Sequence, residues 1–137
     1  MIKLIVGTKG SGKTKTLIDL VNTALNATDG AVVCIEKGDK LNFAINYQCR
    51  LIDTDEYLIT DGQSLFGFIA GILASNHDVT DIFVDSALKI CQNKLESFDK
   101  FLSELEALVD THNINCVITS SIAAEEATET MKKFIEA

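Results

Sequence analysis

Short apolar runs alternate with amphipathic stretches along the 137 residues of the chain. Runs of four to eight apolar residues, rich in β-branched side chains and bounded by turn residues, are typical of strands buried on both faces of a parallel sheet. The third run is the weakest, because it is short and carries charges at both ends. The predicted strands are Ile2–Val6, Ala31–Ile35, Arg50–Asp53, Asp81–Asp85 and Asn115–Ser120.

Between these runs, apolar residues recur every three or four positions, which predicts amphipathic helices. The predicted helices are Lys13–Asn26, Leu41–Tyr47, Gly62–Ser75, Lys94–Asp110 and Ala123–Ile135. Asp61 is placed to cap the third of them. Strands that alternate with helices predict an α/β fold in which helices cover both faces of a mainly parallel sheet. We see no linker or change in composition, so we expect one domain over residues 1–137.

Composition narrows the class of protein. Hydrophobic residues make up 47% of the chain and charged residues 23%, which argues against disorder. The net charge of −8 argues against general binding to nucleic acid, because the phosphate backbone would be repelled. It does not argue against a local anion site built from backbone N–H groups. Eleven of the twelve basic residues are lysines, and Arg50 is the one arginine.

Cysteine spacing and hydropathy indicate the compartment. The cysteines at 34, 49, 91 and 116 lack the short spacings of a zinc site or a redox dithiol. The first residues enter a predicted strand directly, with no signal-peptide pattern. The longest apolar stretch, Leu65–Ala74, is about half of a transmembrane span. We therefore expect a reduced, soluble, cytoplasmic protein without a membrane partner.

Residues 7–14 read Gly-Thr-Lys-Gly-Ser-Gly-Lys-Thr and fit the pattern G-x-x-x-x-G-K-[ST] between a predicted strand and a predicted helix. Glycines let such a loop approach a ligand closely, and its N–H groups point inward at a helix N-terminus as an anion site. We expect Lys13 to reach the β- and γ-phosphates of a nucleotide and Thr14 to offer its hydroxyl to Mg²⁺. The candidate binding residues are Gly7, Thr8, Lys9, Gly10, Ser11, Gly12, Lys13, Thr14 and Lys15.

This loop resembles the Walker A loop of P-loop NTPases, and Ile82-Phe83-Val84-Asp85 resembles their Walker B motif. The resemblance implies that Asp85 holds Mg²⁺ together with Thr14. A predicted strand, Ala31–Ile35, lies in the sequence between the two motifs. In this respect the chain resembles the additional-strand, RecA-like division of P-loop NTPases. That division implies a three-layer P-loop fold with strand order 5-1-4-3-2, and ATP with Mg²⁺ as ligands. An alternative is a vestigial loop, with Asp85 acting only as a helix cap.

The residues that would speed hydrolysis are less clear. Ser86 follows Asp85, where many additional-strand ATPases have a glutamate that activates water. By resemblance to RecA-like ATPases, Glu36 at the end of the second strand is a candidate general base. The acidic segment Asp53–Glu56 is an alternative source. Thr119 or Ser120, at the end of the last strand, resembles the polar residue that contacts the γ-phosphate, although either could instead cap a helix.

Other P-loop families fit less well. In size and in Walker A the chain resembles small bacterial proteins labelled as relatives of the pilus-retraction (PilT) ATPases. True retraction motors are far longer and carry arginine fingers and further motifs. Asn93–Glu96 ends in glutamate where GTPases have aspartate, and Asp85–Leu88 lacks the GTPase glycine. Nucleotide kinases use several lid arginines, which Arg50 alone cannot supply.

The sequence thus predicts an ATP-binding protein with slow, Mg²⁺-dependent hydrolysis. Lys13, Glu36 and Thr119 are its candidate catalytic residues. A second copy or another protein could supply an arginine finger and stimulate turnover. Two alternatives stay open. One is a nucleotide-dependent switch without hydrolysis. The other is a small-molecule phosphotransferase with its acceptor pocket in the segment Asp53–Asp61.

Overall fold

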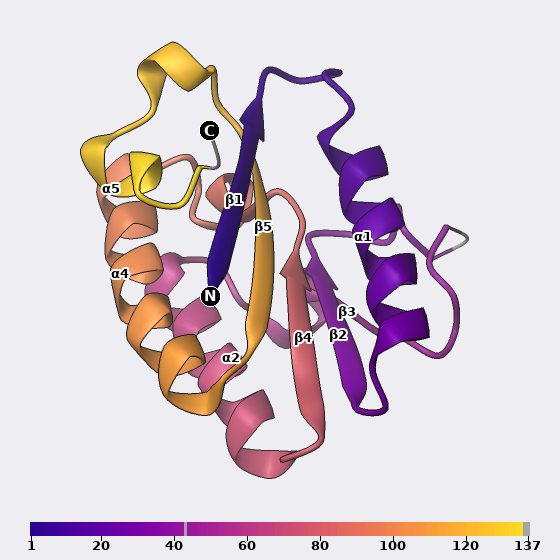
Figure 1. Ribbon diagram of the computed structural model, residues 1–137. Coiled ribbons are helices and arrows are strands. Elements are labelled where there is room, and N and C mark those ends of the chain that lie inside the picture. Colours follow the sequence, from indigo (N-terminus) through magenta and orange to yellow (C-terminus); the bar gives the residue numbers. More distant parts are fainter. Residues whose placement is uncertain (43, 136–137) are drawn as a thin grey trace.

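The computed structural model describes residues 1–42 and 44–135 and contains a five-stranded parallel sheet. Its strands are β1 (Ile2–Gly7), β2 (Ala31–Glu36), β3 (Arg50–Asp53), β4 (Val79–Val84) and β5 (Asn115–Ser121). All four neighbouring pairs are parallel, so the carboxyl ends of the strands share one edge of the sheet (Figure 1). All five predicted strands are therefore confirmed within two residues at each end.

Helices cover both faces of the sheet, as the alternating pattern predicts. The helices are α1 (Lys13–Ala27), α2 (Gly62–Ser75), α3 (Ala87–Ile90), α4 (Leu95–His112) and α5 (Glu129–Lys132), with 3₁₀ turns η1 (Thr54–Tyr57) and η2 (Ala124–Glu126). Figure 1 shows α1 on one side of the sheet, with α2 and α4 on the other. The short α3, directly after β4, has no counterpart among the predicted elements.

Burial along β2 explains why the strand reads as a continuous apolar run. Val33 and Ile35 face the larger core, which α2 and α4 complete. Cys34 faces the smaller core, where it packs with Leu17 and Val21 of α1. Side chains alternate between the two faces of a strand, and both faces are covered here. β2 therefore has no polar position before its carboxyl end.

The predicted strand order 5-1-4-3-2 is wrong. The order is β1-β5-β4-β2-β3, with β1 at one edge and β5 between β1 and β4. The short strand β3 pairs with the outer side of β2 instead of lying between β2 and β4. One isolated parallel bridge among the described residues, between Leu4 and Ile135, joins β1 to the C-terminal segment. The Leu4 N–H donates to the Phe134 carbonyl at 2.8 Å. Strand pairing is long-range, so local sequence does not fix it.

Two predicted helices are also wrong. In Leu41–Tyr47, residue 43 lies outside the described part, and the residues on either side form turns. The side-chain oxygen of Asn46 accepts from the Gln48 N–H, and its carbonyl accepts from the Cys49 N–H. These bonds replace the hydrogen bonds that a helix would form. The predicted helix Ala123–Ile135 is divided into η2 and α5, because Thr128 is extended and its hydroxyl caps α5 by accepting from the Met131 N–H at 3.1 Å.

The apolar helix α2 is confirmed with the predicted bounds. The Asp61 carboxylate accepts from the Ser64 N–H at 2.7 Å and completes a capping box. Within residues 1–42 and 44–135, no helix combines the length and the apolar character needed to span a bilayer.

Candidate functional site

The loop between β1 and α1 leaves the first turn of the helix open. Gly10 and Gly12 have φ angles of +85° and +91°, a region that side chains disfavour. Gly12 is the N-cap of α1 and provides no side-chain hydrogen bond to the helix. The first backbone N–H groups of a helix have no partner within the helix itself. Their donors and the positive end of the helix dipole together make a site for an anion.

Short contacts within the loop fix its shape. A Cβ atom on Gly7 would crowd the Ser11 side chain, so a larger residue there would need Ser11 to shift. The Ser11 N–H donates to the Thr8 carbonyl at 3.1 Å. The Lys13 ammonium donates to the same carbonyl at 3.0 Å and reaches the Ser11 hydroxyl at 3.5 Å. Lys13 therefore folds back over its own loop.

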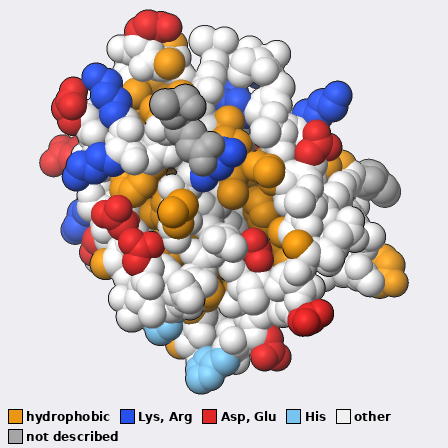
Figure 2. Space-filling view, viewed as in Figure 1, with side chains coloured by type: hydrophobic (Ala, Val, Ile, Leu, Met, Phe, Trp, Pro, Cys, Tyr) orange, Lys and Arg blue, Asp and Glu red, His pale blue; other side chains and the backbone are white. Residues whose placement is uncertain are grey.

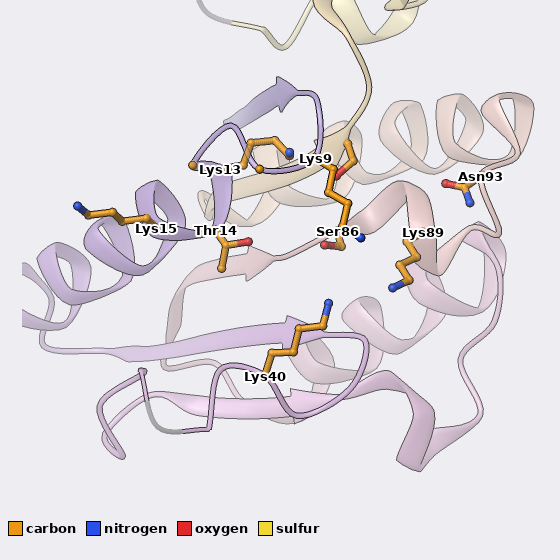
Figure 3. A pocket seen from close by; sticks show the side chains of 11 residues that line it. Lys9, Lys13, Thr14, Lys15, Lys40, Ser86, Lys89 and Asn93 are labelled. Carbon is orange, nitrogen blue, oxygen red and sulfur yellow. The ribbon is translucent and has the colours of Figure 1, made fainter.

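A cavity of about 620 Å³ opens beside this loop (Figure 3). It is lined by Lys9, Gly10, Gly12, Lys13, Thr14, Lys15, Lys40, Ser86, Lys89, Asn93 and Ser121. Five of the eleven lysines of an acidic chain thus line one cavity, and the described lining residues include no Asp or Glu. Figure 2 shows that acidic and basic side chains are both scattered over the face in view. The charge of the lining favours an anionic ligand.

Thr14 and Asp85, predicted as partners around Mg²⁺, lie together. The Thr14 hydroxyl is 3.3 and 3.4 Å from the two carboxylate oxygens of Asp85. Asp85 directly follows β4, is 7% exposed, and donates its N–H to the Ile35 carbonyl at 2.8 Å. Thr119 donates its hydroxyl to Asp85 Oδ1 at 2.7 Å and accepts from the Ser86 N–H at 2.8 Å. The end of β5 therefore orients the carboxylate at the end of β4.

Ser86 turns the chain sharply after Asp85. Its φ of +57° lies in the left-handed region, which costs a non-glycine residue about 1 kcal/mol. Helix α3 begins at the next residue, and Lys89 lies on the cavity as a result. Ser86 thus forms part of the cavity wall.

Glu36, the candidate base, is 2% exposed and does not line the cavity. Its Oε2 accepts from the Leu41 N–H at 3.1 Å. Burial raises the pKa of Glu36, the backbone N–H groups of Leu41 and Lys40 lower it, and the charge of Asp85 raises it further. The carboxylate therefore lies within electrostatic reach of Asp85 but is bonded to the backbone of the following loop.

The other predicted polar residues lie in different parts of the molecule. Ser120 is fully buried, and its hydroxyl has no partner within the described part of the chain. Asp53 accepts from the Gly38 N–H at 2.8 Å, and Asp55 pairs with Lys37 at 2.7 Å. The acidic segment after β3 therefore supports the loop after β2. Arg50 lines a separate hollow of about 80 Å³.

Five cavity residues were not among the predicted site residues, namely Lys40, Ser86, Lys89, Asn93 and Ser121. None belongs to a motif. Lys89 could have been found from its position four residues after Asp85, since a helical turn after the strand returns that residue toward the strand end. Lys40 and Asn93 have no such local signal, because long-range contacts place the loops that carry them.

Over residues 1–42 and 44–135, no three or more His, Cys, Asp or Glu side chains cluster so as to hold a metal ion alone. No protein-family model matches the chain, and a search of curated proteins finds no relative.

Proposed function

We propose that the cavity binds the phosphates of a nucleotide, ATP in the first place, together with Mg²⁺, and that the protein hydrolyses ATP slowly or when a partner stimulates it. One observation carries this proposal. A lysine-lined cavity opens at the glycine loop and the start of α1, and Thr14 and Asp85 meet beside it from two different elements.

The loop supplies donors for phosphate oxygens. Gly12, the N-cap of α1, offers no side-chain cap, so the N–H groups of the first turn have no partner within the helix, whereas the Ser11 N–H is already bonded to the Thr8 carbonyl. Lys13 bonds weak acceptors of its own loop and can exchange them for phosphate oxygens at small cost. A hydrogen bond to a charged group contributes about 1.5–3 kcal/mol, so these donors together account for tight phosphate binding.

Thr14 and Asp85 suit Mg²⁺. This cation prefers oxygen ligands and is held next to phosphates by one or two protein oxygens, with water and phosphate as the other ligands. When bound, it neutralises the charge that develops on the phosphates. Thr119 holds the Asp85 carboxylate in place for this role, and since it is buried and does not line the cavity, we assign it to positioning.

Slow turnover follows from the state of the candidate base. Glu36 lies within electrostatic reach of Asp85, but its Oε2 accepts from the Leu41 N–H. Because Glu36 is buried and does not line the cavity, it can accept a proton from a water beside the phosphates only after the segment that covers it moves. The same contact favours the alternative of a switch, in which bound nucleotide alters the loop after β2 without hydrolysis. The missing guanine signature at Asn93–Glu96 is the reason to place ATP before GTP.

The test is a calorimetric titration of the purified protein with ATP or GTP, with and without Mg²⁺, beside an assay of phosphate release. Lys13→Ala removes the loop ammonium. Lys133→Ala is the matched control, because Lys133 is exposed and lies on the C-terminal segment away from the cavity.

We expect Mg²⁺-dependent ATP binding in the wild type and in Lys133→Ala, and an affinity at least about tenfold lower in Lys13→Ala. Steady release of phosphate supports an ATPase, and binding without release supports the switch. Absence of binding by either nucleotide, or equal binding by both variants, contradicts the proposal.

A further inference from the structure

Two lysines from outside the glycine loop face the cavity. Lys40 belongs to the segment between β2 and β3, and Lys89 belongs to α3. In Figure 3 their ammonium groups point toward the same space, with Thr14 and Ser86 between them and the glycine loop. Lys15 also lines the cavity, but its side chain points away from that space.

The segment that carries Lys40 is held in place on both sides of the lysine. Glu36 accepts from the Leu41 N–H at 3.1 Å, directly after Lys40. Asp53 accepts from the Gly38 N–H at 2.8 Å, two residues before it. A third contact supports the same segment, because Lys37 pairs with Asp55 at 2.7 Å. These contacts hold the backbone of the segment, and with it the point from which the Lys40 side chain reaches the cavity.

Lys89 is held equally well. Its N–H donates to the Ser86 carbonyl at 3.1 Å, and its neighbours Leu88 and Ile90 are buried in the larger core. Its own side chain is exposed to the cavity. The backbone beside both lysines is thus hydrogen-bonded in place, and no described acidic residue lines the cavity to neutralise their ammonium groups. Two like charges that share a cavity favour an anion between them.

On the basis of the proposed function, we infer that Lys40 and Lys89 bind the terminal phosphate of the nucleotide, on the side away from the glycine loop. ATP and ADP differ by this one phosphate. The cavity therefore distinguishes triphosphate from diphosphate with residues of a single chain, and Lys40 and Lys89 supply in cis the positive charge that an arginine finger supplies from a partner. Glu36 acts in this account as a positioning residue for Lys40.

The same ammonium groups could instead hold a separate anionic substrate that accepts the phosphate. The two arrangements differ in how nucleotide affinity responds to loss of the lysines. If the lysines hold the terminal phosphate, their loss weakens triphosphate binding alone. If they hold a separate acceptor, their loss leaves the affinities for both nucleotides unchanged when the acceptor is absent.

The test measures the affinity of the full chain for two probes with Mg²⁺, a non-hydrolysable ATP analogue and ADP. The variants are Lys40→Ala, Lys89→Ala and the charge-retaining Lys40→Arg, with Lys133→Ala as the control. Both target lysines are exposed, so the variants should fold, and an unchanged unfolding midpoint verifies this.

We expect each alanine variant to bind the ATP analogue about tenfold or more weakly, with ADP affinity within about threefold of wild type. Lys40→Arg should retain most of the preference. Equal weakening for both nucleotides, or no change for either, overturns the inference and leaves the proposed function standing. If the wild type binds neither nucleotide, the proposed function itself fails.

Discussion

The two loops that border the cavity are held in different ways. The glycine loop, residues 7–12, takes its shape from its own backbone, with Gly10 and Gly12 at positive φ and Ser11 bonded to Thr8. The segment 37–41 takes its shape from the carboxylates of Glu36 and Asp53 on two neighbouring strands. The first loop is local in sequence, whereas the second depends on the pairing of β2 with β3.

This difference separates two tasks. A loop built from backbone N–H groups binds any phosphate in the same way, because every donor is fixed by the chain itself. A loop held by side chains presents one charged group, Lys40, whose position depends on contacts that substitution can remove. We therefore expect changes in the first loop to affect all nucleotides and changes in the second to affect the preference for ATP over ADP.

We expect the largest effect on turnover from substitution of Asp85, which directly follows β4. Asp85→Asn keeps the size of the side chain and an oxygen that can accept from Thr119, but it removes the negative charge that suits Mg²⁺. We expect turnover and Mg²⁺ affinity to fall by about 10–100-fold, with a smaller loss in ATP affinity. Phosphate release measured across a Mg²⁺ titration tests this. Turnover that stays at the wild-type level removes Asp85 from the site.

A matched pair of glycines tests the comparison directly. Gly12 and Gly38 both have positive φ angles, of +91° and +97°, and a Cβ atom added to either would meet open space. Alanine in either place adds about 1–2 kcal/mol of strain. Gly12→Ala should therefore lower affinity for ATP and ADP alike by about tenfold. Gly38→Ala should lower affinity for ATP more than for ADP. If titrations show that the two variants change the affinities for ATP and ADP in the same way, the two loops do not have different roles.

Two substitutions of Glu36 separate its possible roles. Glu36→Gln keeps an oxygen that can accept from the Leu41 N–H but cannot act as a base, whereas Glu36→Ala removes both functions. We expect the ratio of ATP affinity to ADP affinity to fall about fivefold in Glu36→Ala and to stay at the wild-type value in Glu36→Gln. Phosphate release gives the second readout. If turnover in Glu36→Gln equals that of the wild type, Glu36 is not the base.

The smallest effect concerns pH. Burial raises the pKa of Glu36 above its ordinary 4.5, so the folded protein binds this proton more tightly than the unfolded chain does. Between those two pKa values the folded state carries more protons, and its stability therefore falls as pH rises through the window just above 4.5. Above the folded pKa the loss is complete and constant.

Glu36→Gln should remove this contribution. We expect the free energy of unfolding of the wild type, relative to the variant, to decrease as pH rises above the ordinary pKa of 4.5. Urea unfolding of both proteins at several pH values checks this. A difference between them that is constant with pH, or that grows as pH rises, shows that the pKa of Glu36 is not raised.

The sequence predicts the parts of this molecule whose causes are local. The strands follow from apolar runs covered on both faces, α2 follows from its period and the Asp61 cap, and the glycine loop follows from eight consecutive residues. The meeting of Thr14 with Asp85 was predictable because carboxyl ends of parallel strands share one edge.

The rest depends on contacts between distant residues. The strand order could not be predicted, because β1 pairs with β5 across most of the chain and β3 joins an outer edge. The predicted C-terminal helix was too long, because Thr128 caps a new helix in the middle of one continuous helical pattern of apolar residues. The place of Lys40 on the cavity required the pairing of β2 with β3 and the bond from Leu41 to Glu36.

The most direct test of the account is the map of backbone amide shifts by nuclear magnetic resonance, recorded on the isotope-labelled chain as Mg²⁺ with ADP or with a non-hydrolysable ATP analogue is added. The account predicts the largest shifts at residues 10–14 with both nucleotides, and additional shifts at Lys40, Leu41 and Lys89 with the ATP analogue alone. Largest shifts elsewhere, such as between α2 and α4, or no shifts at residues 10–14, would contradict the central claim that the glycine loop binds nucleotide phosphates.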